Sequence, residues 1–91
     1  MARVEVTRNL ARHLEVSPQL VEGRTVREVL DAMFDRSPGL RGYIVDDQGG
    51  LRKHVVVFVD GEMIRDRHTL SEAVSENTQV VVMQALSGGA R

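Results

Sequence analysis

The chain has 91 residues, no cysteine and nearly balanced charge, with 12 basic and 13 acidic side chains and a formal net charge of −1. This length corresponds to one domain with a modest core, and the missing cysteine excludes disulfides, thiolate metal sites and a side-chain persulfide. The charge balance argues against nucleic-acid and anionic-membrane partners. No apolar run approaches the ~20 residues of a membrane span, and no apolar signal region opens the chain. We therefore expect a cytoplasmic protein.

The first part of the chain predicts two strands. Residues 3–7 alternate polar and apolar side chains and are rich in β-branched residues, which is typical of a half-buried strand. Residues 8–17 have no clear period and predict a loop. Residues 19–23 follow Pro18 and predict a second strand that forms a hairpin with the first.

The main helix is predicted to begin after Thr25. Threonine is a good N-cap, and Glu28 follows at the spacing of a capping box. The helix should end at Ser37-Pro38-Gly39, because proline disfavours helical geometry in the residue before it. An apolar stripe at helical spacing defines the face that packs on the core: Val26, Val29, Leu30, Met33 and Phe34.

The middle of the chain contains the strongest strand pattern, the apolar run at residues 54–59. A continuous apolar run of this length predicts a strand buried on both faces. Asp60-Gly61 is a two-residue hairpin signal and leads to a short partner strand at residues 62–65. Residues 40–50 should form a connection that ends in the turn cluster at residues 46–50.

The last part predicts one helical turn and the closing strand. Apolar side chains between Thr69 and Val74 suggest the helical turn, and residues 79–85 the strand. One helix stripe on a mixed sheet of four to five strands gives a two-layer α+β domain. The apolar runs at residues 55–59 and 80–83 should be interior strands, and the first and last strands should be parallel neighbours.

The order of elements and the end of the chain together resemble a known family. A buried closing strand that runs into Ser87-Gly88-Gly89 is similar to the ubiquitin-like β-grasp sulfur carriers of the MoaD/ThiS family. Residues 50–55, 58–61 and 85–89 look most like the carrier branch linked to a cysteine synthase. The resemblance implies a ubiquitin-like β-grasp fold, with one main helix on the mixed sheet.

The resemblance implies a cosubstrate and not an enzyme, with residues 1–85 as the β-grasp domain and residues 86–91 as a flexible tail. A partner adenylyltransferase of the ubiquitin-activating type would use ATP to adenylate the Gly89 carboxylate. A sulfur donor would then displace AMP and leave a thiocarboxylate, which glycine favours because no Cβ shields its carbonyl. No cofactor would be bound by the chain itself.

Two features of the resemblance concern what surrounds Gly89. Ala90 and Arg91 follow it, and we expect a metallopeptidase to remove them. One alternative is that this chain does not carry out the family chemistry. The other is that the two residues are a cloning addition. The thiocarboxylate would supply an acceptor synthase, cysteine-synthase-like or another, that makes cysteine, methionine, thiamin, molybdopterin or another thio-metabolite. The residues that would thread into the partner's active site are Leu86, Ser87 and Gly88.

The folded body should dock on its partners through an apolar sheet surface beside the tail. The candidates are Val57 or Phe58, Met63, Met83 and Leu86. The competing interpretation of Phe58 and Met83 is that they fill the core, where apolar residues of such runs mostly lie. We predict no metal site, since the three histidines lie on unrelated segments without paired-ligand spacing.

Two further hypotheses use the same fold. A ubiquitin-like modifier would be joined through Gly89 to lysines of target proteins, and the sequence does not separate this from sulfur transfer. A β-grasp binding module would work without its tail. Lys53 is the single lysine of the chain, so self-conjugation through a lysine could use only that residue.

Overall fold

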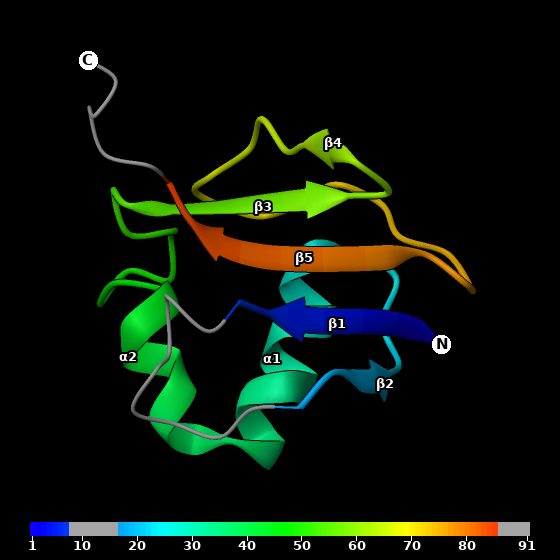
Figure 1. Ribbon diagram of the computed structural model, residues 1–91. Helices are drawn as coiled ribbons and strands as arrows, with labels where there is room; N and C mark the ends of the chain where they lie inside the picture. The colour runs from blue at the N-terminus through cyan, green and yellow to red at the C-terminus, as the bar shows by residue number, and fades with distance from the viewer. Residues whose placement is uncertain (8–16, 86–91) are drawn as a thin grey trace.

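The computed structural model describes residues 1–7 and 17–85, and the strands in these ranges form one five-stranded mixed sheet in the order β2-β1-β5-β3-β4 (Figure 1). The predicted loop at residues 8–17, apart from Ser17, and the predicted tail at residues 86–91 lie outside the described residues. The strands are β1 (Ala2–Val6), β2 (Gln19–Val21), β3 (Val55–Val59), β4 (Glu62–Met63) and β5 (Gln79–Gln84). The helices are α1 (Val26–Arg36), the 3₁₀ turn η1 (Pro38–Leu40) and α2 (Arg41–Ile44).

The closing strand β5 lies in the middle of the sheet. It pairs in parallel with β1, with Val4 opposite Val80, and antiparallel with β3, with Val57 opposite Val82. The short strands β2 and β4 pair antiparallel with β1 and β3 and form the two edges. The predicted parallel pairing of the first and last strands and the interior position of both apolar runs are therefore confirmed.

Helix α1 begins as the sequence predicts. The Thr25 hydroxyl accepts a hydrogen bond from the Glu28 N–H at 3.2 Å, and the Glu28 carboxylate accepts one from the Arg24 N–H at 2.8 Å, one residue before the cap. These bonds satisfy N–H groups that have no partner within the helix. All five residues of the predicted stripe are buried. The helix packs on one face of the sheet (Figure 1).

The prediction that β3 is buried on both faces is wrong. Val55 and Val57 are fully buried, whereas Val56 and Phe58 are only half-buried. Side chains alternate between the two faces of a strand, and the helices cover only one of these faces. Strand β5 follows the same rule, because Val80 and Val82 are buried while Val81 and Met83 are half-buried.

The helical turn predicted between Thr69 and Val74 is also wrong. The Asp66 carboxylate accepts hydrogen bonds from N–H groups of residues 68, 69 and 71, and Leu70 adopts a positive φ of 57°. The carbonyls of Leu70 and Glu72 then accept hydrogen bonds from the first N–H groups of α1. These hydrogen bonds hold the segment against the start of α1 in a non-helical conformation.

The remaining connections follow their local sequence. Residues 38–44 form η1 and α2 where only an irregular connection was predicted. Asp60 and Gly61 have φ angles of 49° and 88°, as a two-residue hairpin of the predicted type requires. Over the described part of the chain, the helices are all too short or too polar to traverse a lipid bilayer.

Candidate functional site

An apolar surface occupies the part of the sheet's open face that β3, β4 and β5 form, on the side that the helices do not cover. We call it the apolar face; it consists of Val56, Phe58, Met63, Val81 and Met83. The register makes it continuous, because Phe58 lies opposite both Met63 on β4 and Val81 on β5. Val56 lies opposite Met83 one pair further along.

The members of the apolar face differ in exposure. Met63 is 55% exposed, and the other four residues are half-buried. Three docking candidates from the sequence, Phe58, Met63 and Met83, are thus brought together on one surface, and neither Phe58 nor Met83 is in the core. Val57, the alternative to Phe58, has 0% exposure and points into the core, so it is excluded from a docking surface.

Val56 and Val81 belong to this surface, although the sequence analysis did not select them. A signal for them existed, since each lies two residues before a selected candidate, Phe58 or Met83, on the same strand. Residues two apart on a strand share a face. The signal was missed because a run of consecutive valines does not itself indicate which face is covered.

The chain leaves the sheet beside the apolar face. Strand β5 ends at Gln84, and the Ala85 N–H then donates to the His54 carbonyl at 2.7 Å, at the start of β3. Figure 1 shows the end of β5 next to the beginning of β3. The predicted tail and reactive residues lie outside the described residues: Leu86, Ser87, Gly88, Gly89, Ala90 and Arg91.

The border of the apolar face is polar. Arg3 is exposed and Glu5 is half-buried on β1, and Glu5 lies opposite Val81. Lys53 and His54 are exposed where β3 begins, next to the point where β5 ends. An apolar centre with a polar border is the usual composition of a protein–protein interface. The surface is therefore suited to docking, and its centre contains no acid, base or nucleophile.

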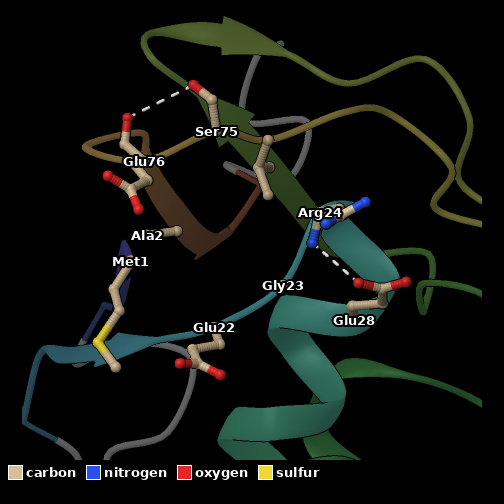
Figure 2. Close-up of a pocket in the computed structure, with 9 residues that line it drawn as sticks. Met1, Ala2, Glu22, Gly23, Arg24, Glu28, Ser75 and Glu76 are labelled. Atoms are coloured by element: carbon tan, nitrogen blue, oxygen red, sulfur yellow. Dashed lines mark hydrogen bonds between the residues drawn. The ribbon is translucent and has the colours of Figure 1, made fainter.

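A second candidate site is a hollow at the other end of the sheet, near the start of β1 (Figure 2). Its carboxylates come from Glu22, Glu28 and Glu76. Figure 2 shows the bond from the Arg24 N–H to Glu28, so this carboxylate is engaged in capping α1. Among the described residues, no three histidine, cysteine, aspartate or glutamate side chains are grouped so as to hold a metal ion. We therefore assign no function to this hollow.

Comparison with family models decides the identity of the chain. The model described as the ThiS family matches residues 5–89, which covers all five strands except the start of β1. The chain belongs to the ThiS family. The family match ends on Gly89 and leaves out Ala90 and Arg91.

Solved structures of family-like proteins agree with this assignment. SAMP1 from Haloferax volcanii is 26% identical, with a TM-score of 0.73 over 97% of this chain and 98% of that one. A chain of the BexX/CysO complex from Amycolatopsis orientalis is 22% identical, with a TM-score of 0.78 over 98% and 100% of the two chains. CysO from Mycobacterium tuberculosis is 19% identical, with a TM-score of 0.76 over 94% and 100%.

These similarities confirm the predicted fold. The α+β architecture is the ubiquitin-like β-grasp of the ThiS family, and the neighbours include CysO proteins, as the predicted resemblance implies. A search of curated protein sequences finds no significant match.

Proposed function

We propose that this ThiS-family protein is a sulfur carrier whose Gly89 carboxylate is adenylated and converted to a thiocarboxylate. The observation on which this rests is the family match, which extends through Gly88-Gly89 and ends at residue 89. The chain has no cysteine, so a main-chain carboxylate is the site where it could carry sulfur covalently. In this proposal the protein is a cosubstrate, and it binds no cofactor of its own.

The apolar face of the folded domain also supports the proposal. It places Met83 one residue before the end of β5, and Phe58 and Met63 lie further back along the strands on the same face. Leu86 to Gly89 reach at most ~13–14 Å when extended, at ~3.3–3.6 Å per residue. A partner that docks on the apolar face could therefore receive Gly89 in an active site some distance below its surface.

The proposal implies four partners, which act in the cytoplasm. An adenylyltransferase of the ubiquitin-activating type uses ATP to form the acyl-adenylate, and a sulfur donor displaces AMP. An acceptor synthase then takes the sulfur; the structure of a CysO neighbour in a complex with BexX supports a second protein as partner. A metallopeptidase removes Ala90 and Arg91 beforehand.

The test is the intact mass of the protein isolated from its own cells. We expect a chain that ends at Gly89, with a fraction heavier by the difference between one sulfur and one oxygen atom. A control variant with Gly89 replaced by Ala and the same trimming should lack the heavier species. A population that contains only the 91-residue chain, with no sulfur-bearing species, would contradict the proposal.

A protein-modifier function is the second candidate, because SAMP1, a small archaeal modifier protein, is 26% identical over nearly the whole chain. In that function Gly89 is joined to lysines of other proteins. Affinity purification of a tagged chain followed by peptide mass spectrometry distinguishes the two. No lysine or arginine lies between Arg67 and Gly89, so trypsin would leave a branch of residues 68–89 on a modified lysine. Such branched peptides on lysines of other proteins would support the modifier, and a thiocarboxylate without them would support the carrier.

A further inference from the structure

The four methionines of the chain lie in different environments. Met33 in α1 has 0% exposure, and Met83 is half-buried on the apolar face. Met1 and Met63 are 51% and 55% exposed. Because the chain has no cysteine, thioether sulfurs are its most readily oxidised side-chain atoms, and exposure decides which of them an oxidant reaches first.

Met63 combines exposure with a position on the docking surface. It lies on the two-residue edge strand β4, directly opposite Phe58. Met1 is equally accessible but lines the hollow at the start of β1, a strand that β5 and β3 separate from β4. Oxidant would therefore modify both residues, and only the modification of Met63 would alter the apolar face.

We propose that Met63 is an oxidation site through which peroxide switches off docking of the carrier. This inference rests on the proposed function, because it assumes that the apolar face binds the adenylyltransferase. The sulfur of Met63 donates two electrons to the peroxide O–O bond, one oxygen becomes bonded to sulfur, and the other leaves as water. Met83 is a slower second site on the same surface, since it is half-buried.

The physical effect follows from the polarity of the sulfoxide. Oxidation turns a flexible apolar side chain into a polar one. On docking, the sulfoxide oxygen would be removed from water next to Phe58 without a donor from this chain's apolar face to replace the lost hydrogen bonds. Such burial of an unpaired polar group costs enough free energy to weaken binding by about tenfold or more.

The experiment uses the chain ending at Gly89 and the ubiquitin-activating-type adenylyltransferase from the same cells. Only the carrier is treated with hydrogen peroxide, and the peroxide is removed before the assay. ATP–pyrophosphate exchange is then measured as a function of carrier concentration for the treated and the untreated carrier. Peptide mass spectrometry records the sulfoxide fraction at each methionine. We expect oxidised Met63 to raise the carrier concentration needed for half-maximal exchange by about tenfold, and methionine sulfoxide reductase to reverse the effect.

A Met63→Leu, Met83→Leu double variant is the control. For this variant we take the ratio of the half-maximal carrier concentrations after and before peroxide treatment. Any effect of the substitutions themselves on docking is present in both measurements and cancels in the ratio. Met1 remains in this variant as an exposed thioether, and its oxidation should not change the ratio. Thermal unfolding of treated and untreated protein should coincide, which excludes a general loss of structure.

Three outcomes would contradict the inference. In the first, the wild-type chain supports the same exchange when Met63 is fully oxidised. In the second, Met63 stays reduced while Met1 is oxidised. In the third, the double variant loses as much exchange after peroxide as the wild type does. Failure of the proposed function looks different, because untreated wild-type chain would then give no exchange at any concentration.

Discussion

At the scale of single residues, Asp66 organises the connection between β4 and β5. Its carboxylate accepts hydrogen bonds from the hydroxyls and N–H groups of Thr69 and Ser71 and from the N–H of His68. The bonds from Ser71 and Thr69 hold the pKa of the Asp66 carboxyl well below its ordinary value of 3.8. This connection in turn provides the carbonyls that cap α1.

We predict that Asp66 contributes stability only while it is ionised. A carboxyl whose pKa is lowered on folding stabilises the folded state above its unfolded pKa and loses that contribution as the pH falls below it. The wild-type chain should therefore lose stability as the pH falls below about 3.8, and Asp66→Asn should be less stable at pH 7 and lose less on acidification. Urea unfolding at a series of pH values measures this. Asp47→Asn, at an exposed aspartate in a turn, is the matched control for the loss of one carboxylate.

Gly23 and Gly42 give a second prediction at this scale. A Cβ on Gly23 would lie 2.9 Å from the backbone nitrogen of Val29, in α1, whereas a Cβ on Gly42 in α2 would meet nothing within 4 Å. We expect Gly23→Ala to destabilise the protein by ~1–3 kcal/mol through overpacking, and Gly42→Ala to stabilise it by ~0.5–1 kcal/mol because alanine favours helix. Urea unfolding compares them; an equal effect of the two substitutions would contradict the close packing at Gly23.

At the scale of elements, the two faces of β3 have different roles: one packs in the core and the other forms part of the apolar face. Val57 is fully buried and Val56 is half-buried on the apolar face. Val57→Ala should cost ~2–3 kcal/mol of unfolding free energy, because two buried carbons are lost and a cavity remains. Val56→Ala should cost under ~1 kcal/mol, since an exposed face relaxes readily.

The same pair of variants tests the apolar face. Among folded molecules, Val57→Ala should support ATP–pyrophosphate exchange with the adenylyltransferase at the wild-type carrier concentration. Val56→Ala should need a higher concentration, because it removes apolar contact area from the docking surface. A Phe58→Ala variant extends the test. If Val56→Ala, Phe58→Ala and the wild type all need the same carrier concentration for exchange, the partner binds elsewhere on the molecule.

At the scale of the whole molecule, the body and the tail should be separable. The hydrogen bonds that join β5 to its neighbours in the described part of the chain involve residues up to Ala85. We therefore predict that a chain ending at Ala85 unfolds at the same temperature as the full chain but is not adenylated, whereas a chain ending at Gly89 is. Thermal unfolding and adenylate formation measure the two properties.

Complementation extends this test to cells. A chain ending at Ala85 should fail to replace the full-length protein, and the chain ending at Gly89 should succeed without the peptidase. If the chain ending at Ala85 restores function, both tail-based functions are wrong and the protein is a β-grasp binding module.

The sequence alone was enough to predict most of the elements, the α1 cap, the Asp60-Gly61 hairpin and the central pairing of the first and last strands. These depend on local signals, such as the Thr25 and Glu28 spacing or the apolar run of β5, that act within a few residues. The Gly-Gly sequence and its family resemblance also come from the sequence, and the predicted chemistry at Gly89 stays a prediction.

Only the tertiary structure decided which face of each apolar strand is covered. A run of valines has the same local pattern whether one face or both are buried, so Val56 and Val57 cannot be separated until α1 is placed on one side of the sheet. The conformation of the segment after Asp66 was decided in the same way, because its carbonyls bind N–H groups of α1 that lie more than 40 residues earlier in the chain. Long-range partners override a local helical preference when they satisfy more backbone groups than one helical turn could.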